Sequence, residues 1–205
     1  MTIGPRFTIG QRFARLVTNV VVRAPFLWRV FRGRMTRQFD RLASEWDETR
    51  VSRERLAPMI AALDGIDGDR VGRALDVGTG TGAVARLLSE RWPGAEVTGI
   101  DVSPGMVEEA RRLGHERYEV GDAASLPYDD GEFDLVTLNN MIPFFDEIAR
   151  ITAPGGYVAV SYSMGPRTPI WVPIERVRAE LERRGFVHVA DFRAGPGIAL
   201  LAKRP

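Results

Sequence analysis

A short stretch of the chain combines an acid with three glycines at alternating positions. In LDVGTGTGAVARLL, residues 75–88, Asp76 lies near the end of a mainly apolar run, and the glycines begin directly after Val77. Glycine-rich turns between a strand and a helix bring backbone N–H groups close to a ligand, usually a phosphate. A carboxylate at the end of the strand repels phosphate and attracts positive charge. The turn therefore predicts a site for a ligand that carries a positive charge.

A second acid follows at a spacing typical of dinucleotide-binding folds. Gly78, Gly80 and Ala83 satisfy the loose pattern G-x-G-x-x-G/A, and Asp101 follows Gly82 by 19 residues. This spacing makes a nicotinamide-dependent oxidoreductase one hypothesis. The acid beside the turn favours a different ligand, S-adenosylmethionine, which has an ammonium and a sulfonium group and no phosphate.

The elements that position these residues alternate between strands and helices from residue 71 onward. This alternation predicts an α/β fold, a doubly wound and mostly parallel seven-stranded sheet that ends in an antiparallel C-terminal hairpin strand. The expected strands include RALDV, AEVTGID, ERYEVGD, FDLVTL, GGYVAVSYS, FVHVADFRA and IALLAKR. Helices are expected in TGAVARLLSERW, SPGMVEEARRL and PIERVRAELERRG, the second with Ser103 as its N-cap.

The first part of the chain has a different pattern. Residues 1–39 contain eight arginines and no acid, so the remaining residues are net negative by seven although the chain is +1 overall. Helical spacing of apolar residues predicts an amphipathic helix that Pro25 interrupts. Its apolar residues are Phe13, Leu16, Val17, Val20, Ala24, Leu27 and Phe31. A second helix is expected in RMTRQFDRLASEWDETR, and a third over residues 52–63. We expect a helical lid or arm over residues 1–70 and a ligand-binding domain over residues 71–205.

Composition excludes several classes of site. The chain of 205 residues has no cysteine and two histidines, so disulfides, thiolate metal sites and thiol catalysis are excluded, and we expect no metal site. Arginines within the first apolar stretch oppose a signal peptide or a membrane-spanning helix, and a cytoplasmic protein is expected. The net acidic main part disfavours a nucleic-acid substrate.

Four stretches in order resemble the motifs of class I S-adenosylmethionine-dependent methyltransferases of the small-molecule type. Residues 75–88 resemble their first motif, and VTGIDVSPGMVEEAR their second strand and helix. YEVGDAASLPYDDGEFDLV is similar to their third and fourth strands, and TAPGGYVAVSYS to their fifth. The resemblance spans about residues 71–164. FDRLASEWD, nearer the N-terminus, also resembles the entry segment of small-molecule members.

The resemblance implies a role for individual residues. Asp76 would hold the amino group of the cofactor's methionine part, directly or through water, against the backbone of the glycine turn. Asp101 would accept both ribose hydroxyls, Met106 would pack on the adenine, and Asp122 would accept the adenine amino group. The implied cofactor-binding set is Trp46, Asp76, Gly78, Thr79, Gly80, Gly82, Asp101, Val102, Met106, Asp122, Ala123 and Asn139.

The remaining members of this set have roles of three kinds. The Ala123 amide would face an adenine nitrogen, and Asn139 would lie near the methionine part. Trp46 would cap the sulfonium with its aromatic face. No catalytic residue is assigned, and Tyr162 and Asn140 are candidates for acceptor contact.

The expected function is methyl transfer by in-line displacement to a small, hydrophobic acceptor. The alternatives are an NAD(P)-dependent oxidoreductase and a non-catalytic S-adenosylmethionine-binding protein. NMIPF, residues 140–144 with the leading Asn140, is similar to the N-x-P-[FY] motif of amino-group methyltransferases, with one extra residue. Three roles are open for the basic N-terminal segment: a packed lid, which we expect, an arm on an anionic membrane, and a dimer contact.

Overall fold

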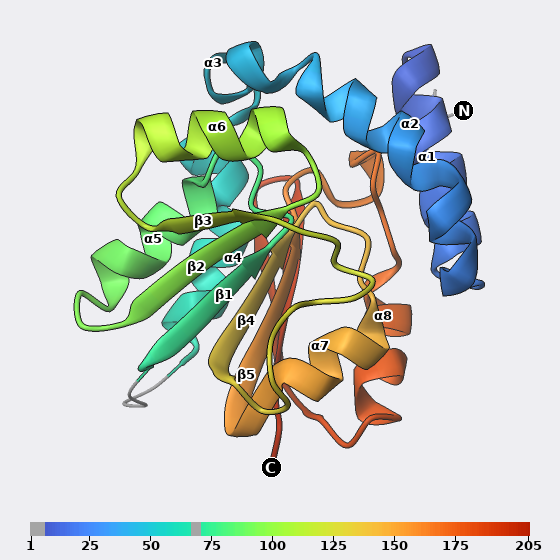
Figure 1. Cartoon of the computed structure of the whole chain (residues 1–205). Coiled ribbons are helices and arrows are strands. Elements are labelled where there is room, and N and C mark those ends of the chain that lie inside the picture. The colour runs from blue at the N-terminus through green and yellow to red at the C-terminus, as the bar shows by residue number, and fades with distance from the viewer. Residues whose placement is uncertain (1–6, 67–70) are drawn as a thin grey trace.

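The computed structural model describes residues 7–66 and 71–205. Its centre is a seven-stranded sheet with the order β3-β2-β1-β4-β5-β7-β6 (Figure 1). The strands are β1 Arg73–Val77, β2 Glu96–Asp101, β3 Arg117–Val120, β4 Phe133–Asn139, β5 Thr152–Tyr162, β6 Val187–Ala194 and β7 Gly197–Lys203. The first five strands run parallel, whereas β7 is antiparallel to both of its neighbours. The predicted fold class is confirmed.

Parallel pairing places the carboxyl ends of β1 to β5 at one edge of the sheet. The chain runs outward from β1 through β2 to β3 and then returns to pair β4 with the other side of β1. Loops diverge at such a reversal and leave room for a ligand beside the first strand. The glycine turn after β1 lies at this point.

Helices cover both faces of the sheet. One apolar cluster joins residues of α4 Arg53–Asp64, α5 Ala83–Arg91 and α6 Pro104–Leu113 to one face. A second cluster joins α7 Phe145–Ile151 and α8 Ile174–Glu182 to the other face. The local sequence explains where α6 begins, because Ser103 accepts a hydrogen bond from the Met106 amide and Pro104 suits the first turn.

Two antiparallel N-terminal helices pack beside the second cluster. They are α1 Ile9–Val21 and α2 Trp28–Asp40, joined by a short 3-10 turn at Pro25–Leu27. The predicted break at Pro25 is confirmed. The buried side of α1 differs from the expected one: Ala14, Val17, Thr18 and Val21 are buried, whereas Leu16 is 56% exposed. The reason is angular, because Leu16 lies about 200° around the helix from Ala14.

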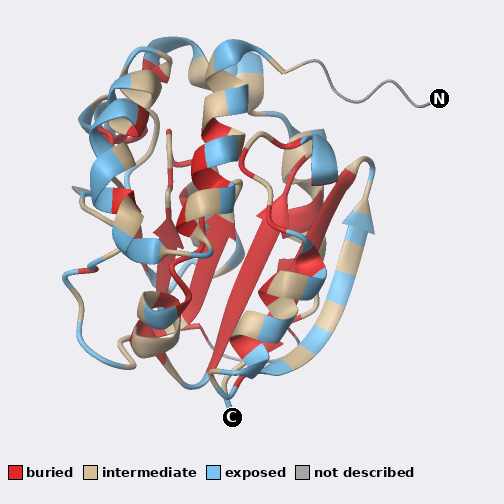
Figure 2. Cartoon of the chain, turned by 90° about the vertical axis from the view of Figure 1, so that its right-hand side faces the viewer, coloured by how far each residue is buried: buried red, intermediate tan, exposed pale blue. Residues whose placement is uncertain are grey.

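The second predicted helix is interrupted. It ends at Asp40, a 3-10 turn follows at Ala43–Glu45, and α3 covers only Trp46–Arg50. The third expected helix corresponds to α4. Figure 2 shows the consequence for burial: the strands in the middle of the sheet are buried, while the outer sides of the surrounding helices are exposed. Within the described residues, every helix is too short or too polar to cross a bilayer.

Candidate functional site

The glycine turn has a backbone that only glycine adopts readily. Gly78, Gly80 and Gly82 have φ values of 70°, 56° and 82°, and Gly82 directly precedes α5. The amides of Gly78 and Thr79 donate to the Ile100 carbonyl, at 2.8 and 3.0 Å, and so fasten the turn to β2. A Cβ atom on Gly78 would lie 2.6 Å from the Met141 sulfur. The turn therefore allows close approach to its backbone, and Met141 is the side chain now lying there.

Besides Asp47, which is described below, three carboxylates lie around this turn. Asp76 in β1 is 1% exposed and accepts a hydrogen bond of 2.8 Å from the Thr137 hydroxyl. Asp101 at the end of β2 accepts from the amides of Gly80 and Ser103, both at 2.9 Å. Asp40 at the end of α2 accepts from the Ser103 hydroxyl at 2.5 Å. The sequence indicated the first two and gave no signal for Asp40.

Burial and a neighbouring negative charge raise the pKa of Asp76 and of Asp101. Burial is the main cause that raises the pKa of Asp76 to about 7, while the hydroxyls of Thr79 and Thr137 partly oppose it and the charge of Asp101 adds to it. Burial likewise raises the pKa of Asp101, and the charge of Asp40 contributes. Across residues 7–66 and 71–205, none of these acids forms an ion pair with Arg, Lys or His. The site therefore suits a ligand that brings positive charge.

Asp122 lies after β3 and is held by the N-terminal helices. One carboxylate oxygen accepts from the Trp28 indole N–H at 2.8 Å and from the Ala124 amide at 3.0 Å. The other accepts from the Arg32 guanidinium at 2.8 Å. A carboxylate has about four acceptor positions, so these contacts leave about one for a ligand. Sequence reasoning missed both Trp28 and Arg32.

The neighbours of Asp122 and Asp101 differ in their exposure. Met106 is 1% exposed within α6, so it belongs to the core in this conformation. Ala123 is 7% exposed, and Val102 packs against the same apolar cluster as Trp28. The structure thus places these side chains next to the two acids but keeps Met106 covered.

Trp46 lies beside the glycine turn. A Cβ atom on Gly80 would be 3.9 Å from the indole nitrogen, and the Arg50 guanidinium lies 4.8 Å from the ring centroid. The next residue, Asp47, accepts a hydrogen bond from the Thr81 hydroxyl and pairs with Arg86 at 3.2 Å. The segment before α4 is therefore fastened to the turn through Asp47, a residue that the sequence patterns did not single out.

The ends of β4 and β5 carry neutral polar side chains. Asn139 accepts a hydrogen bond of 2.8 Å from Ser161. Asn140 has a positive φ of 55° and is held by Ser163, whose amide donates to its side-chain oxygen at 2.9 Å. An asparagine tolerates this backbone better than most residues. Tyr162, one of the two candidates for acceptor contact, is fully buried at 0% exposure, because its ring packs on Trp171 within the second apolar cluster.

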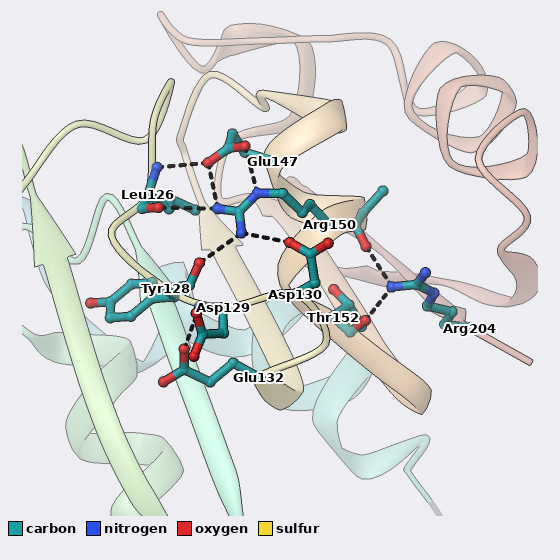
Figure 3. A network of polar contacts seen from close by, with 10 residues as sticks. Leu126, Tyr128, Asp129, Asp130, Glu132, Glu147, Arg150, Thr152 and Arg204 are labelled. Carbon is teal, nitrogen blue, oxygen red and sulfur yellow. Dashed lines mark hydrogen bonds and ion pairs between the residues drawn. The ribbon is translucent and has the colours of Figure 1, made fainter.

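Arg150 of α7 secures the loop that continues from Asp122 (Figure 3). Its guanidinium donates to the carbonyls of Tyr128 and Leu126, at 2.6 and 3.0 Å, and also binds Asp130 and Glu147. Glu147 in turn accepts from the Leu126 amide at 2.7 Å. One arginine thus satisfies two loop carbonyls and orders the segment between β3 and β4.

Comparison with known proteins gives consistent results. Residues 75–160 match a family model described as "Methyltransferase domain". The chain is 34% identical over 194 residues to a malonyl-[acyl-carrier protein] O-methyltransferase of Geobacter sulfurreducens, covering 78% of this chain and 73% of that protein. It is 42% identical over 100 residues to a demethylmenaquinone methyltransferase of Thermus thermophilus, covering 43% and 46%. The chain thus spans about half of this second relative.

Solved structures share the fold. An S-adenosylmethionine-dependent methyltransferase from Aquifex aeolicus matches with a TM-score of 0.63 and 21% identity, over 83% of this chain and 98% of that one. A Haloferax volcanii methyltransferase activator complex matches with a TM-score of 0.69 and 20% identity, over 82% and 97%. At these identities the likeness shows the architecture alone.

Proposed function

Because the chain belongs to the class I S-adenosylmethionine-dependent methyltransferase family, we propose that the edge of the sheet beside Gly78–Gly82 holds this cofactor for methyl transfer to a small acceptor. The observation that carries the proposal is the group of acids around the turn. Asp101 accepts from the Gly80 amide of the turn, and Asp76 lies two residues before Gly78 and is buried. Neither acid has a cationic partner in the described part of the chain. An ammonium and a sulfonium group satisfy that charge, whereas a pyrophosphate would increase the repulsion.

The proposed contacts follow from the position of each acid. Asp101 accepts the two ribose hydroxyls with the oxygen positions not occupied by the Gly80 and Ser103 amides. Asp122 accepts the adenine amino group with its remaining position, and Trp28 and Arg32 fix the direction of its carboxylate. Met106, Ala123 and Val102 give the adenine an apolar wall once α6 and the following loop adjust.

Within residues 7–66, the helices α1, α2 and α3 act as a lid over the ligand-binding domain of residues 71–205, whereas α4 packs on the sheet. Asp40 binds the start of α6, Asp47 binds the glycine turn, and Trp28 binds Asp122. Three points of the lid therefore contact three different loops at the same edge. This arrangement excludes water from a bound cofactor and aligns the acceptor, which are the main contributions a protein makes to this reaction.

The cofactor supplies a methyl carbon activated by the sulfonium, and a neutral thioether leaves. Trp46 presents an aromatic ring beside the turn, where Arg50 now occupies one face, and this ring is suited to a cation. Asn139 lies near the methionine part. The side-chain amide of Asn140 donates one N–H to the Ser163 hydroxyl at 3.0 Å and has a second N–H for an acceptor oxygen.

We propose an acceptor whose nucleophilic atom is already anionic near neutral pH, such as a carboxylate or an ionised enol. A general base is required only when the acceptor must lose a proton early in the reaction. The side chains at the ends of β4 and β5 are neutral and hydrogen-bonded within the pairs Asn139–Ser161 and Asn140–Ser163, and none of them takes up a proton at this pH. The relatives reported above are named as a malonyl-[acyl-carrier protein] O-methyltransferase and a demethylmenaquinone methyltransferase. A cytoplasmic location agrees with this function.

The test is an acceptor panel with the full chain and S-adenosylmethionine. A malonyl thioester and a reduced naphthoquinone represent the two acceptor classes, and mass spectrometry measures the methylated product together with S-adenosylhomocysteine. We expect turnover with one of them and its loss in Asp101→Asn. Asp134→Asn is the matched control, because Asp134 accepts from the Gly72 amide at the opposite edge of the sheet. Binding of NAD(H) without binding of S-adenosylhomocysteine would contradict the proposal.

A further inference from the structure

The outward side of the N-terminal helix pair is unusually apolar for an exposed surface. Its large hydrophobic side chains are Ile9, Leu16, Phe26 and Val30, with exposed fractions of 84%, 56%, 64% and 67%. In the described part of the chain, the other exposed large hydrophobic residues are Val120, Val187 and Val189. Single exposed apolar residues are common, but this concentration on one helix pair needs an explanation.

Arginines alternate with these apolar side chains. Ile9, Arg12, Leu16 and Arg23 follow one another at helical spacing along α1 and its end. Phe26, Val30 and Arg37 do the same through the 3-10 turn and α2, with Arg29 and Arg34 beside them. We call the surface formed by these apolar residues and arginines the outer face.

The row of apolar residues and arginines on α1 and the row on α2 both point away from the body of the protein. The helices pack side by side, with the Phe13 and Phe31 rings 6.3 Å apart and the Gln38 side chain donating to the Gly10 carbonyl. Both helices turn their buried residues, such as Val17 and Trp28, toward the body of the protein. Figure 1 shows the pair at the side of the molecule, beyond the sheet, and Figure 2 shows exposed residues along both helices. The outer face is thus continuous and free of other elements of the described chain.

The charge of the outer face is not compensated locally. Its arginines Arg12, Arg23, Arg29, Arg34 and Arg37 form no ion pair with any carboxylate of residues 7–66 and 71–205. Their recorded contacts are of other kinds, such as the Arg34 guanidinium 4.2 Å from the Phe13 ring centroid. Asp40, the acid at the end of α2, is directed toward Ser103 instead.

We propose that the outer face docks on an anionic lipid surface. The four apolar side chains would enter the boundary between headgroups and acyl chains, and the arginines would face the lipid phosphates, as in interfacial amphipathic helices. The charge distribution gives the orientation: residues 1–39 carry eight arginines and no acid, while the remainder of the chain is net negative by seven. An anionic surface therefore attracts the helix pair and repels the body.

The outer face and the candidate site share one helix, α2. The inner side of α2 carries Trp28 and Arg32, which hold Asp122. Docking through the outer side of the same helix would place the helix that holds Asp122 at the bilayer surface. The docking surface does not depend on the proposed methyl transfer, since Phe26, Val30 and the arginines of the outer face do not belong to the site.

The experiment is flotation of the full chain with vesicles, without cofactor or acceptor, so its outcome is separate from that of the proposed function. One set of vesicles contains phosphatidylcholine alone and the other phosphatidylcholine with phosphatidylglycerol. We expect binding to the second set, weakened by salt. R12Q/R29Q/R37Q should bind about 100-fold more weakly, at about five-fold per arginine. F26S/V30S should lose about ten-fold or more for each buried side chain.

Two matched controls change the same residue types elsewhere. V187S/V189S alters exposed valines of β6, and R53Q/R193Q alters exposed arginines outside the helix pair. Both should bind like the unaltered chain, and circular dichroism should show all variants folded. Equal binding to both vesicle sets, or unchanged binding of the outer-face variants, would overturn the proposal. So would binding of an acidic carrier protein or self-association through this face in the absence of vesicle binding.

Discussion

Replacing Asp76 by asparagine tests the electrostatic account of the site. The introduced side chain would keep an oxygen that accepts the Thr137 hydrogen bond but would remove the buried charge. The pKa of Asp76 is raised from 3.8 to about 7, mainly by burial. Both the stability of the free protein and its affinity for cofactor should therefore change with pH in the unaltered chain and change less in the variant.

For stability, the direction follows from which state retains the proton. Below about pH 3.8 the carboxyl is protonated in both states, and its stabilising effect on the fold is complete. Between pH 3.8 and about 7 the folded protein retains a proton that the unfolded chain has released, so the free energy of unfolding falls by about 1.4 kcal/mol per pH unit. The total is about 4 kcal/mol. Asp76→Asn should lose this slope and be more stable than the parent at about pH 8.

For binding, the ionised carboxylate is the form that attracts the cofactor's ammonium group. With a pKa of about 7, the ionised fraction falls about 25-fold between about pH 7.5 and about pH 5.5. The affinity for S-adenosylhomocysteine, measured by calorimetric titration, should fall by the same factor. Asp76→Asn should bind more weakly at about pH 7.5, by about 1.5–3 kcal/mol, with little change over this range.

The controls separate Asp76 from its neighbour. Asp101 also has a raised pKa, so any pH dependence that persists in Asp76→Asn belongs to that residue. Asp134→Asn, at the opposite edge of the sheet, should show the same affinity for S-adenosylhomocysteine and the same pH dependence of that affinity as the parent. An affinity of the unaltered protein that is constant between about pH 5.5 and 7.5 would refute the assignment of Asp76 to the ammonium group.

Three further predictions concern single contacts. Asp101→Ala should weaken cofactor binding by about 1–3 kcal/mol in calorimetry, and it should also lower the melting temperature because the Gly80 and Ser103 amides lose their acceptor. Trp28→Phe should lower the free energy of unfolding in urea by about 2 kcal/mol, since a buried donor to Asp122 is lost. Arg32→Gln should lower it by at most about 1 kcal/mol, because Arg32 is half-exposed. Equal effects of the two variants would contradict this ranking. Arg150→Met should cost about 1–3 kcal/mol in the same assay, because the Leu126 and Tyr128 carbonyls lose their donor, and an unchanged midpoint would show that water replaces it.

Much of the fold could be predicted because its signals are local. The alternation of apolar strands with helical periodicity indicated the order and type of the elements from residue 71 onward, and Ser103 and Pro104 marked the start of α6. The glycine turn was equally clear, because positive φ angles at Gly78, Gly80 and Gly82 require a residue without a side chain. Each of these features depends on residues within a few positions of one another.

The prediction for the N-terminal helices was less complete, for a physical reason. Helical spacing identified an amphipathic helix, but the predicted apolar side included both Leu16 and Val17, which lie about 100° apart around the helix. Packing in the second apolar cluster buried Ala14 and Val17 and left Leu16 exposed. Periodicity reports that a helix has an apolar side; only the shape of the neighbouring surface decides which residues it buries.

The residue types and their order along the chain are enough to predict the chemistry of the site: acids beside a glycine turn at the ends of parallel strands. The partners that complete the site depend on how distant segments pack. Trp28 and Arg32 bind Asp122 across 94 and 90 positions of the chain, and Asp40 reaches Ser103 across 63. No local pattern encodes such pairs, because they arise only when α2 packs beside α6 and the loop after β3 and so brings distant segments within hydrogen-bond distance.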